Sequence, residues 1–385
     1  MQFTIEEKLG PTAIAELQTE WQELFSASDA APFLSWEWIS TWHRWLGPQL
    51  APRILCVRAE QRLIGLLALG EEETGLAGFK LKRLSLLGAR HGGADYLGVL
   101  ALAGYEHEAN TAISHYLTSN LKADVLALEE LAADAVTRVA FEQAFGQSAQ
   151  SKYQQLPRYV CPQIHLDTDW PTLLKRSRRA DNFKRRLRQL NALPGFEYRS
   201  VTAPTETDAA FARFLQLHEA RWKEAGGSEA TGHTALVQFH QEVTQKLSQA
   251  GWLRFDELWC EGECRATIYG VETGKQFYYF NAGYDPAWSR YSVGLVLLGL
   301  SISNAIQRGV QVYDFLRGTE SYKSDWATTT RETVVIQIAN QQWPTTLAMG
   351  FSTLQQELKT FAQAHLPSGL QQSLRSLKRQ YLLSR

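Results

Sequence analysis

The chain has 385 residues, of which 44% are hydrophobic, and it contains 12 Trp, 14 Tyr and 17 Phe. This composition excludes a disordered chain, and the length predicts two or three folded domains. The formal net charge of −1 excludes a global attraction to nucleic acid or anionic membranes, so any such attraction must be local. Four cysteines, the absence of a long apolar run and a start without a secretory pattern lead us to expect a soluble, cytoplasmic protein.

The first half of the sequence predicts helices that alternate with a strand meander. The tryptophans Trp38, Trp42 and Trp45 follow helical spacing, and we interpret this face as core rather than as a ligand cage. A glycine-rich loop over 88–93 precedes the segment Asp95-Tyr96-Leu97-Gly98. Helices are expected at 12–25, 109–121 and 136–145, and strands at 53–58, 63–69, 81–87 and 125–128. This half therefore predicts a mixed α/β domain.

A change of composition over 147–166, where Ser, Gln, Tyr and Pro replace periodic apolar residues, predicts a domain boundary. We divide the chain into an N-terminal unit (1–155), a C-terminal unit (156–345) and a helical tail (346–385). Asp169 and Pro171 predict the start of one helix. That helix is strongly basic and contains Lys175, Arg176, Arg178, Arg179, Lys184, Arg185, Arg186 and Arg188. It is either a phosphate-binding surface or an ordinary solvated face.

The second half repeats the element order of the first. Turn signals at Gly262 and Gly274 link three strands into a meander, and Gly309 suits the residue just past a helix end. Helices are expected at 211–222, 235–247 and 293–306, and strands at 252–259, 265–272, 276–283 and 310–316. The order helix, helix, meander, helix, strand occurs twice, which indicates an internal duplication of one α/β unit.

The stretch 277–326 is expected to hold the functional site. An aromatic strand leads through a turn to a helix whose first turn contains Ser292 and Gly294, and the free N–H groups of a helix start suit an anionic ligand. On the next strand, a buried Asp314 carboxylate would have the raised pKa of a general base. Alternatively, Asp314 caps a loop or pairs with Arg317 or Lys323.

Several separated motifs carry a resemblance to a known family. They are the Arg-rich segment 178–188, the segment 218–222, Gly283-Tyr284-Asp285-Pro286, the segment 291–294, Tyr313-Asp314-Phe315-Leu316-Arg317-Gly318 and the segment 322–326, together with the N-terminal segments 32–42 and 95–98. In this order they resemble the CelD/BcsL-like acetyltransferases, a branch of the GNAT superfamily associated with bacterial polysaccharide gene clusters. The resemblance implies an α/β fold with two tandem GNAT-like domains, each a mixed, mostly antiparallel sheet flanked by helices. Fem-type aminoacyl transferases share this arrangement.

The resemblance also implies an N-acyltransferase that moves an acyl group, with acetyl as the first choice, from an acyl-CoA to an amine on a small-molecule or sugar-linked acceptor. It assigns donor binding to Asn281, Gly283, Arg290, Tyr291, Ser292, Val293 and Gly294. From their positions on and just past the strand that ends near residue 316, we expect catalysis by Asp314, Glu320 and Lys323. We expect acceptor binding by His218, Arg221, Trp222, Tyr284, Arg317 and Tyr322. For two of these residues an ordinary role stays open, a core histidine for His218 and a salt bridge for Lys323.

Two further interpretations stay open. The helix start retains only one glycine, Gly294, and Fem-type proteins likewise lack a good pyrophosphate loop, so an aminoacyl-tRNA donor held by the basic helix is an alternative. A non-catalytic binding subunit of a polysaccharide pathway is another. We expect no metal site, because Cys260 and Cys264 lack a second ligand pair.

Overall fold

The computed structural model of the chain describes residues 3–76, 79–223 and 234–340, so the predicted helical tail at 346–385 lies outside the described residues. The N-terminal half contains β1 (Phe3–Leu9), α1 (Ala13–Glu16), α2 (Gln18–Ser26), η1 (Pro32–Leu34), α3 (Trp36–Leu46), β2 (Ala51–Ala59), β3 (Arg62–Leu76), β4 (Phe79–Leu86), β5 (Leu100–Ala101), α4 (Glu106–Asn120), β6 (Val125–Ala132), α5 (Val136–Phe145) and β7 (Ser151–His165). The C-terminal half contains α6 (Trp170–Arg176), α7 (Ala180–Asn191), β8 (Glu197–Val201), η2 (Pro204–Glu206), α8 (Thr207–Lys223), α9 (Thr234–Gln249), β9 (Leu253–Cys260), β10 (Glu263–Thr273), β11 (Gln276–Tyr284), η3 (Pro286–Tyr291), α10 (Val293–Gln307), β12 (Val312–Asp314), α11 (Ser321–Ser324) and β13 (Thr329–Asn340).

The strand order confirms the predicted duplication. In the first unit, β1 to β4 form an antiparallel meander and β4 pairs with β6 in parallel. In the second unit, β8 to β11 form the same meander and β11 pairs with β12 in parallel. Each parallel connection passes through one helix, α4 or α10, as a parallel crossover requires.

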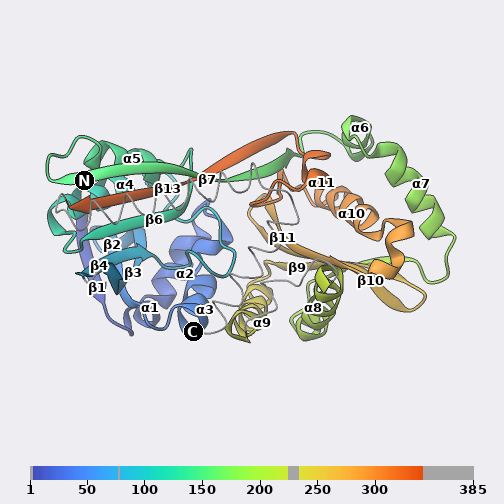
Figure 1. The fold of residues 1–385 in the computed structure, drawn as a ribbon, viewed down its shortest axis with the longest axis horizontal. Coiled ribbons are helices and arrows are strands. Elements are labelled where there is room, and N and C mark those ends of the chain that lie inside the picture. The colour runs from blue at the N-terminus through green and yellow to red at the C-terminus, as the bar shows by residue number, and fades with distance from the viewer. Residues whose placement is uncertain (1–2, 77–78, 224–233, 341–385) are drawn as a thin grey trace.

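Two long strands join the units into one sheet, with the order β1-β2-β3-β4-β6-β13-β7-β12-β11-β10-β9-β8. Strand β7 pairs with β12 of the second unit, whereas β13 pairs with β6 of the first. The two strands also pair with each other along β13, and Figure 1 shows them running between the two halves of the molecule. Each unit is thus completed by a strand from the opposite half of the chain.

The hydrophobic core falls into two main clusters. The larger one holds the N-terminal core and continues into α8 and α9 of the second unit, where α9 lies beside α3 (Figure 1). Trp38 and Trp42 are buried, as predicted, while the Trp45 indole donates to Glu242 of α9 over 2.7 Å. The smaller cluster lies on the other face of the second unit's sheet, beneath α6, α7 and α10.

Some sequence expectations were wrong in detail. The basic segment forms two helices, α6 and α7, because the backbone is extended at Ser177 (ψ 138°). The strand expected at 310–316 is shorter, since β12 ends at Asp314 and Leu316 adopts a left-handed conformation (φ 54°). The boundary segment contains the strand β7, and the strands β1, β8 and β13 were not expected. Asp169 caps α6 as predicted, accepting from the Thr172 N–H over 2.9 Å, and Gly309 follows α10 with φ 81°.

Two glycines provide a test of how closely α8 lies on the sheet. A Cβ on Gly283 would lie 2.5 Å from the backbone nitrogen of His218 in α8, whereas a Cβ on Gly294 would meet nothing closer than 3.6 Å. We therefore expect Gly283→Ala to lower the free energy of unfolding by about 1–3 kcal/mol, and Gly294→Ala to leave it nearly unchanged. Denaturant unfolding of the two variants measures the difference, and equal stabilities would contradict the close packing of α8.

Candidate active site

The candidate site lies where β11 and β12 diverge. The two strands are in parallel register from Gln276 and Val312 to Tyr278 and Asp314. Beyond that point β12 ends, while β11 continues to Tyr284. A register shift in the pairing of β10 with β11 places Phe280 as an extra residue between Tyr279 and Asn281. Such a bulge bends a strand and redirects its groups, so the divergence and the bulge occur at the same place.

The free edge of β11 carries the backbone groups of Ala282. Its N–H donates to the Asn281 side-chain oxygen over 2.8 Å. Its carbonyl accepts from Arg221 over 3.2 Å and lies 3.4 Å from Nδ1 of His218. Two residues of α8, His218 and Arg221, therefore reach the edge of β11 beyond its register with β12.

The connection after β11 leads directly to the start of α10. Asp285 caps the short helix η3 by accepting from the Ala287 N–H over 3.0 Å. Ser292 takes a left-handed conformation (φ 52°, ψ 47°) and does not cap α10 with its side chain. Its carbonyl accepts from the N–H groups of Leu295 and Val296. The N–H groups of Val293 and Gly294 thus come before the first helical hydrogen bonds, as the anion-binding expectation requires.

The predicted donor-binding residues therefore occupy one continuous stretch. Asn281 and Gly283 lie on β11, Arg290 and Tyr291 on η3, and Ser292 to Gly294 at the start of α10. The Arg290 guanidinium is exposed and lies 4.6 Å from the centroid of the Tyr291 ring.

A cluster of tyrosines and one arginine lies beside the free edge of β11. The Arg221 guanidinium lies 5.3 Å from the Tyr284 ring centroid, and the rings of Tyr279 and Tyr322 lie 6.4 Å apart. Burial raises the pKa of Tyr322, and its contacts with Tyr279 and Arg221 partly oppose that shift. Of the predicted acceptor-binding residues, the structure thus brings together Arg221, Tyr284 and Tyr322. Sequence reasoning did not identify Tyr279.

His218 also belongs to this region but is buried. Its side chain packs against Phe214, with ring centroids 5.4 Å apart, and burial lowers its pKa. A lowered pKa keeps the imidazole neutral at physiological pH. Trp222 follows on α8, and its side chain lies outside the described part of the structure.

The predicted catalytic residues fall into two groups. Glu320 and Lys323 form an ion pair of 3.1 Å in the segment after β12, where half of the Glu320 side chain is exposed and that of Lys323 is 5% exposed. Lys323 also donates to the Arg317 carbonyl over 2.7 Å. Asp314, in contrast, is fully buried, so it does not share the solvent-facing position of Glu320.

Asp314 points toward the N-terminal unit. Its carboxylate accepts from the Tyr96 hydroxyl over 2.9 Å, from the Gln163 amide over 2.6 Å and from the Leu316 N–H over 2.7 Å. Burial raises its pKa to about 6, against the opposing effect of these hydrogen bonds. The partners are thus Tyr96 and Gln163, rather than the Arg317 or Lys323 considered from the sequence.

Arg317 points in the same direction. Its backbone N–H and its Nε donate to the two oxygens of Asp95 over 3.1 and 2.9 Å. Its guanidinium pairs with Glu130 at 3.4 Å and lies 4.4 Å from the Tyr159 ring centroid. The segment Asp95-Tyr96 and the segment Asp314 to Arg317, both found as motifs, therefore meet at the junction of the units. Glu130 and Gln163 were not identified from the sequence.

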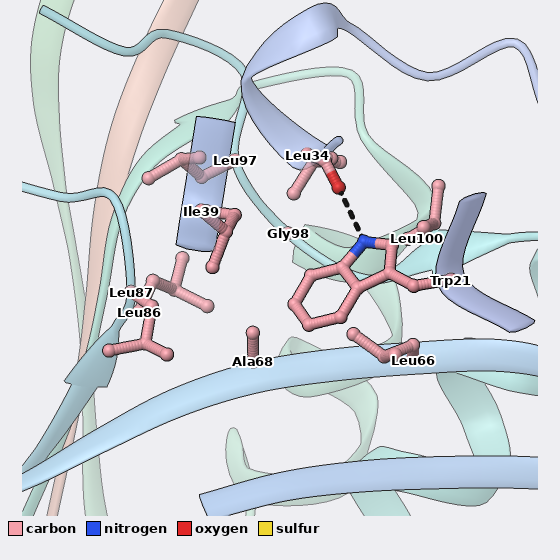
Figure 2. Close-up of a pocket in the computed structure, with 10 residues that line it drawn as sticks. All are labelled: Trp21, Leu34, Ile39, Leu66, Ala68, Leu86, Leu87, Leu97, Gly98 and Leu100. Carbon is pink, nitrogen blue, oxygen red and sulfur yellow. Dashed lines mark hydrogen bonds between the residues drawn. The ribbon is translucent and has the colours of Figure 1, made fainter. Parts of the chain in front are cut away.

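The corresponding place in the N-terminal unit differs. Strands β4 and β6 are in parallel register from Arg83 and Val125 to Ser85 and Ala127, and farther along Leu97 forms a parallel bridge with Leu131. Figure 2 shows the small apolar cavity beside this bridge, into which the Trp21 indole projects. The cavity measures about 10 Å³, which is about the space of one water molecule.

The outer face of α6 and α7 retains the predicted positive charge. Exposed cations are Lys175, Arg176, Arg178, Lys184, Arg185 and Arg188. Helix α7 rests on α10, because a Cβ on Gly299 would lie 2.3 Å from Phe183. Arg179 is different, since it forms an ion pair of 2.5 Å with Asp325.

Two features bear on metals and membranes. Among residues 3–76, 79–223 and 234–340, no group of three or more His, Cys, Asp or Glu side chains is placed to hold a metal ion. None of the helices in the same part of the chain combines the length and the apolar character that a bilayer crossing requires.

Comparison with known proteins supports the expected fold. Residues 176–324 match the family described as an acetyltransferase (GNAT) domain. No curated protein matches the sequence. Among solved structures, the chain resembles FemX (TM-score 0.58, 11% identity, 86% of this chain and 96% of that chain). It also resembles the C-terminal domain of a putative lysylphosphatidylglycerol synthetase from Agrobacterium fabrum (TM-score 0.55, 8% identity, 89% and 97%) and L-PGS from Bacillus licheniformis (TM-score 0.52, 10% identity, 88% and 96%).

These findings confirm an α/β fold, whose two units share one strand order, and residues 176–324 are similar to a GNAT acetyltransferase domain. At such low identity the solved structures show the fold alone. The CelD/BcsL-like identity, the assigned site residues and the domain bounds stay predictions.

The buried carboxylate of Glu130, at the junction of the units, leads us to predict how stability depends on pH. Burial raises the pKa of Glu130 from 4.5 to about 7, although Arg317 and Arg158 oppose the shift. The folded state therefore holds this proton more tightly than the unfolded chain, so the contribution of Glu130 to stability is lost as pH rises from about 4.5 to about 7. We therefore expect the free energy of unfolding of wild type, measured relative to that of Glu130→Gln, to fall by up to about 3 kcal/mol from pH 5 to pH 8.

Urea unfolding at both pH values measures this change. Glu73→Gln is the control, because it makes the same substitution at a side chain that is 69% exposed. If Glu130→Gln also behaves identically at pH 5 and pH 8, the buried carboxylate does not titrate in this range.

Proposed function

We propose that the C-terminal unit is an N-acyltransferase that moves an acyl group, with acetyl as the first choice, from an acyl-CoA to an amine. The observation that carries this proposal is the divergence of β11 from β12 beyond Tyr278 and Asp314, followed at once by the helix start at residues 292–294. A free strand edge offers N–H groups to a developing oxyanion, and a helix start offers them to phosphates. Both features lie within the residues that match the GNAT domain.

The reaction needs few protein groups. The amine nitrogen attacks the thioester carbonyl, a C–N bond forms, the C–S bond breaks and the amine loses a proton, while the thiol leaves. The Ala282 N–H, which donates to the Asn281 side chain in this structure, would turn to the carbonyl oxygen, and the Gly294 end of α10 would receive the phosphates. Glu320 is the carboxylate that accepts the proton, because its side chain is half exposed and Lys323 fixes it at 3.1 Å. Asp314, which is fully buried, acts as a positioning residue.

We call the divergence of β11 from β12 the candidate cleft, and we assign its acceptor side to the cluster of Arg221, Tyr279, Tyr284 and Tyr322. Its hydroxyl and guanidinium groups fit a polar acceptor rather than an apolar one. The resemblance to CelD/BcsL-like proteins points to an amine on a sugar or an envelope precursor, modified in the cytoplasm. This acceptor class is part of the proposal.

The donor can be tested by thermal shift. Acetyl-CoA at about one hundred times its Kd stabilises a binding protein by about 2.7 kcal/mol, so we expect the Tm of the wild-type chain to rise by several degrees. Gly294→Trp should abolish this rise, because the indole would occupy the helix start. Gly294→Ala is the matched control and should retain it, since its Cβ would lie 3.6 Å from Tyr284.

The proposal is overturned if neither acetyl-CoA nor longer acyl-CoAs raise the Tm at saturating concentrations. A rise that persists in Gly294→Trp would place the donor elsewhere on the molecule.

A second candidate is a Fem-like transferase that uses an aminoacyl-tRNA. The observation that favours it is the set of exposed cations on α6 and α7, on a fold similar to that of FemX. Contacts between such cations and phosphates release counterions, so the affinity falls steeply with salt. A third candidate, a non-catalytic binding subunit, requires neither donor.

The second candidate predicts that charged tRNA binds with a strong salt dependence. Replacing Lys184, Arg185 and Arg188 by Gln should weaken binding at least tenfold and lower the slope of log K against log salt by about two to three. Arg179 stays intact because it pairs with Asp325. The control replaces Arg62, Lys80 and Lys152, which are exposed cations on other surfaces. Filter binding at 50 and 200 mM salt measures both sets, and absence of binding at 50 mM eliminates this candidate.

A further inference from the structure

The segment 94–98 of the N-terminal unit makes contacts in two directions. On one side it lies along β6, where Leu97 donates its N–H to the Glu130 carbonyl over 3.0 Å and bridges to Leu131. Gly98 (φ 150°) passes so close to Thr137 that a Cβ would lie 2.9 Å from its hydroxyl. The strand edge of β6 beyond its register with β4 is therefore occupied by the chain itself.

The two units differ in the connection that leads from the meander to the following helix. The connection from the meander to the following helix covers residues 87–105 in the first unit but only residues 285–292 in the second. The first turn of α4 is acidic, with Glu106 and Glu108, and Glu106 accepts from the Gly104 N–H over 2.9 Å. Carboxylates at a helix start repel phosphates. The first unit thus differs from the second both beside the diverging strands, where Leu97 bonds β6, and at the helix start, where α4 is acidic.

On its other side the same segment holds the second unit. The two oxygens of Asp95 accept from the N–H and the Nε of Arg317, and the Ala94 carbonyl accepts from the same guanidinium. The Tyr96 hydroxyl donates to Asp314 over 2.9 Å. Tyr96 has a left-handed backbone (φ 59°), which is unfavourable for a bulky residue and persists only where the surroundings fix it.

These contacts lie at the point where the candidate cleft opens. Asp314 is the last residue of β12 in register with β11, and its second oxygen accepts from the Leu316 N–H over 2.7 Å, which turns the chain away from β11. Arg317 leads to Lys323, whose Nζ donates to the Arg317 carbonyl. The segment that leaves β11 is therefore held by groups of the other unit and by β7, whose Pro162 and Val160 carbonyls accept from the N–H groups of Phe315 and Gly318.

We propose that residues 94–98 close the acyl cleft of the first unit and shape that of the second, with Asp95 and Tyr96 as positioning residues of the acyl-transfer site. The N-terminal unit then serves as a structural part of the active site and binds no donor of its own at β4 and β6. This inference rests on the proposed function only in naming the cleft an acyl-transfer site, since the contacts hold whatever the cleft binds.

Hydrogen–deuterium exchange of the full chain tests the inference without a ligand. Tyr96→Phe removes only the hydroxyl that donates to Asp314, and Asp95→Asn removes the charge that faces Arg317. Loss of a hydrogen bond to a charged group raises the equilibrium constant for local opening by about tenfold to hundredfold. We expect amides in 312–323 and 279–284 to exchange faster by such a factor, while those of β1 and β2 keep their wild-type rates.

The matched control is Tyr116→Phe, which removes another hydroxyl of the same unit, 3.4 Å from Glu7. We expect it to leave exchange in 312–323 unchanged. The inference is overturned if Tyr96→Phe speeds exchange only within the N-terminal unit, if it acts equally over the whole chain, or if Tyr116→Phe gives the same pattern.

Acetyl-CoA titration of the same variants adds a functional readout. Tyr96→Phe should raise the Kd about tenfold, whereas Tyr116→Phe should not change it. If wild type does not bind acetyl-CoA, the proposed function fails, and the exchange pattern still decides whether residues 94–98 shape the cleft. If the donor binds and Tyr96→Phe leaves both Kd and exchange unchanged, the positioning role is wrong.

Discussion

The candidate cleft depends on the exchange of β7 and β13 between the two units. Strand β12, whose departure from β11 opens the cleft, is only three residues long. It is paired with β11 on one side and with β7 on the other, and β7 is in turn paired with β13, which reaches β6 of the first unit. A strand this short has little stability of its own, so its position follows from the longer strands beside it. The two units therefore form one structural body at the site, although the chain repeats the same fold twice.

The duplicated fold is used differently in its two copies. The parallel pairs β4–β6 and β11–β12 are equivalent in the strand order, yet where they diverge Leu97 bonds β6 in the first copy, whereas in the second copy Ala282 of β11 lies beside Arg221. The difference lies in the length and charge of one connection rather than in the sheet. The function of each unit therefore has to be inferred from its connections, because the strands that the two units share in arrangement do not distinguish them.

Much of the fold could be predicted from local patterns. The Gly262 and Gly274 turns, the Asp169 cap and the helix that ends before Gly309 each depend on residues close in sequence. Strands β7 and β13 were missed because both are completed by partners from the opposite half of the chain, so their many polar residues do not alternate as those of a strand beside a single core do. For the site, the donor-binding stretch could be placed because it is continuous. Tyr279, Glu130 and Gln163 could not, since their importance arises only from contacts across the sheet.

The segment that ends β12 shows why a motif alone does not assign roles. Successive strand side chains point to opposite faces, so Tyr313 and Phe315 enter the core beneath α10 while Asp314 and Leu316 face the larger core. The left-handed turn at Leu316 precedes Arg317, which bonds Asp95, while Tyr322 lies beside Tyr279 of β11. The raised pKa of Asp314 arises from burial at the junction, and buried structural networks perturb a pKa as readily as catalytic sites do. Asp314, which is buried at the junction, and Glu320, whose side chain is half exposed, are thus carboxylates in different surroundings, and the chain between them links the junction to the segment that we propose for the chemistry.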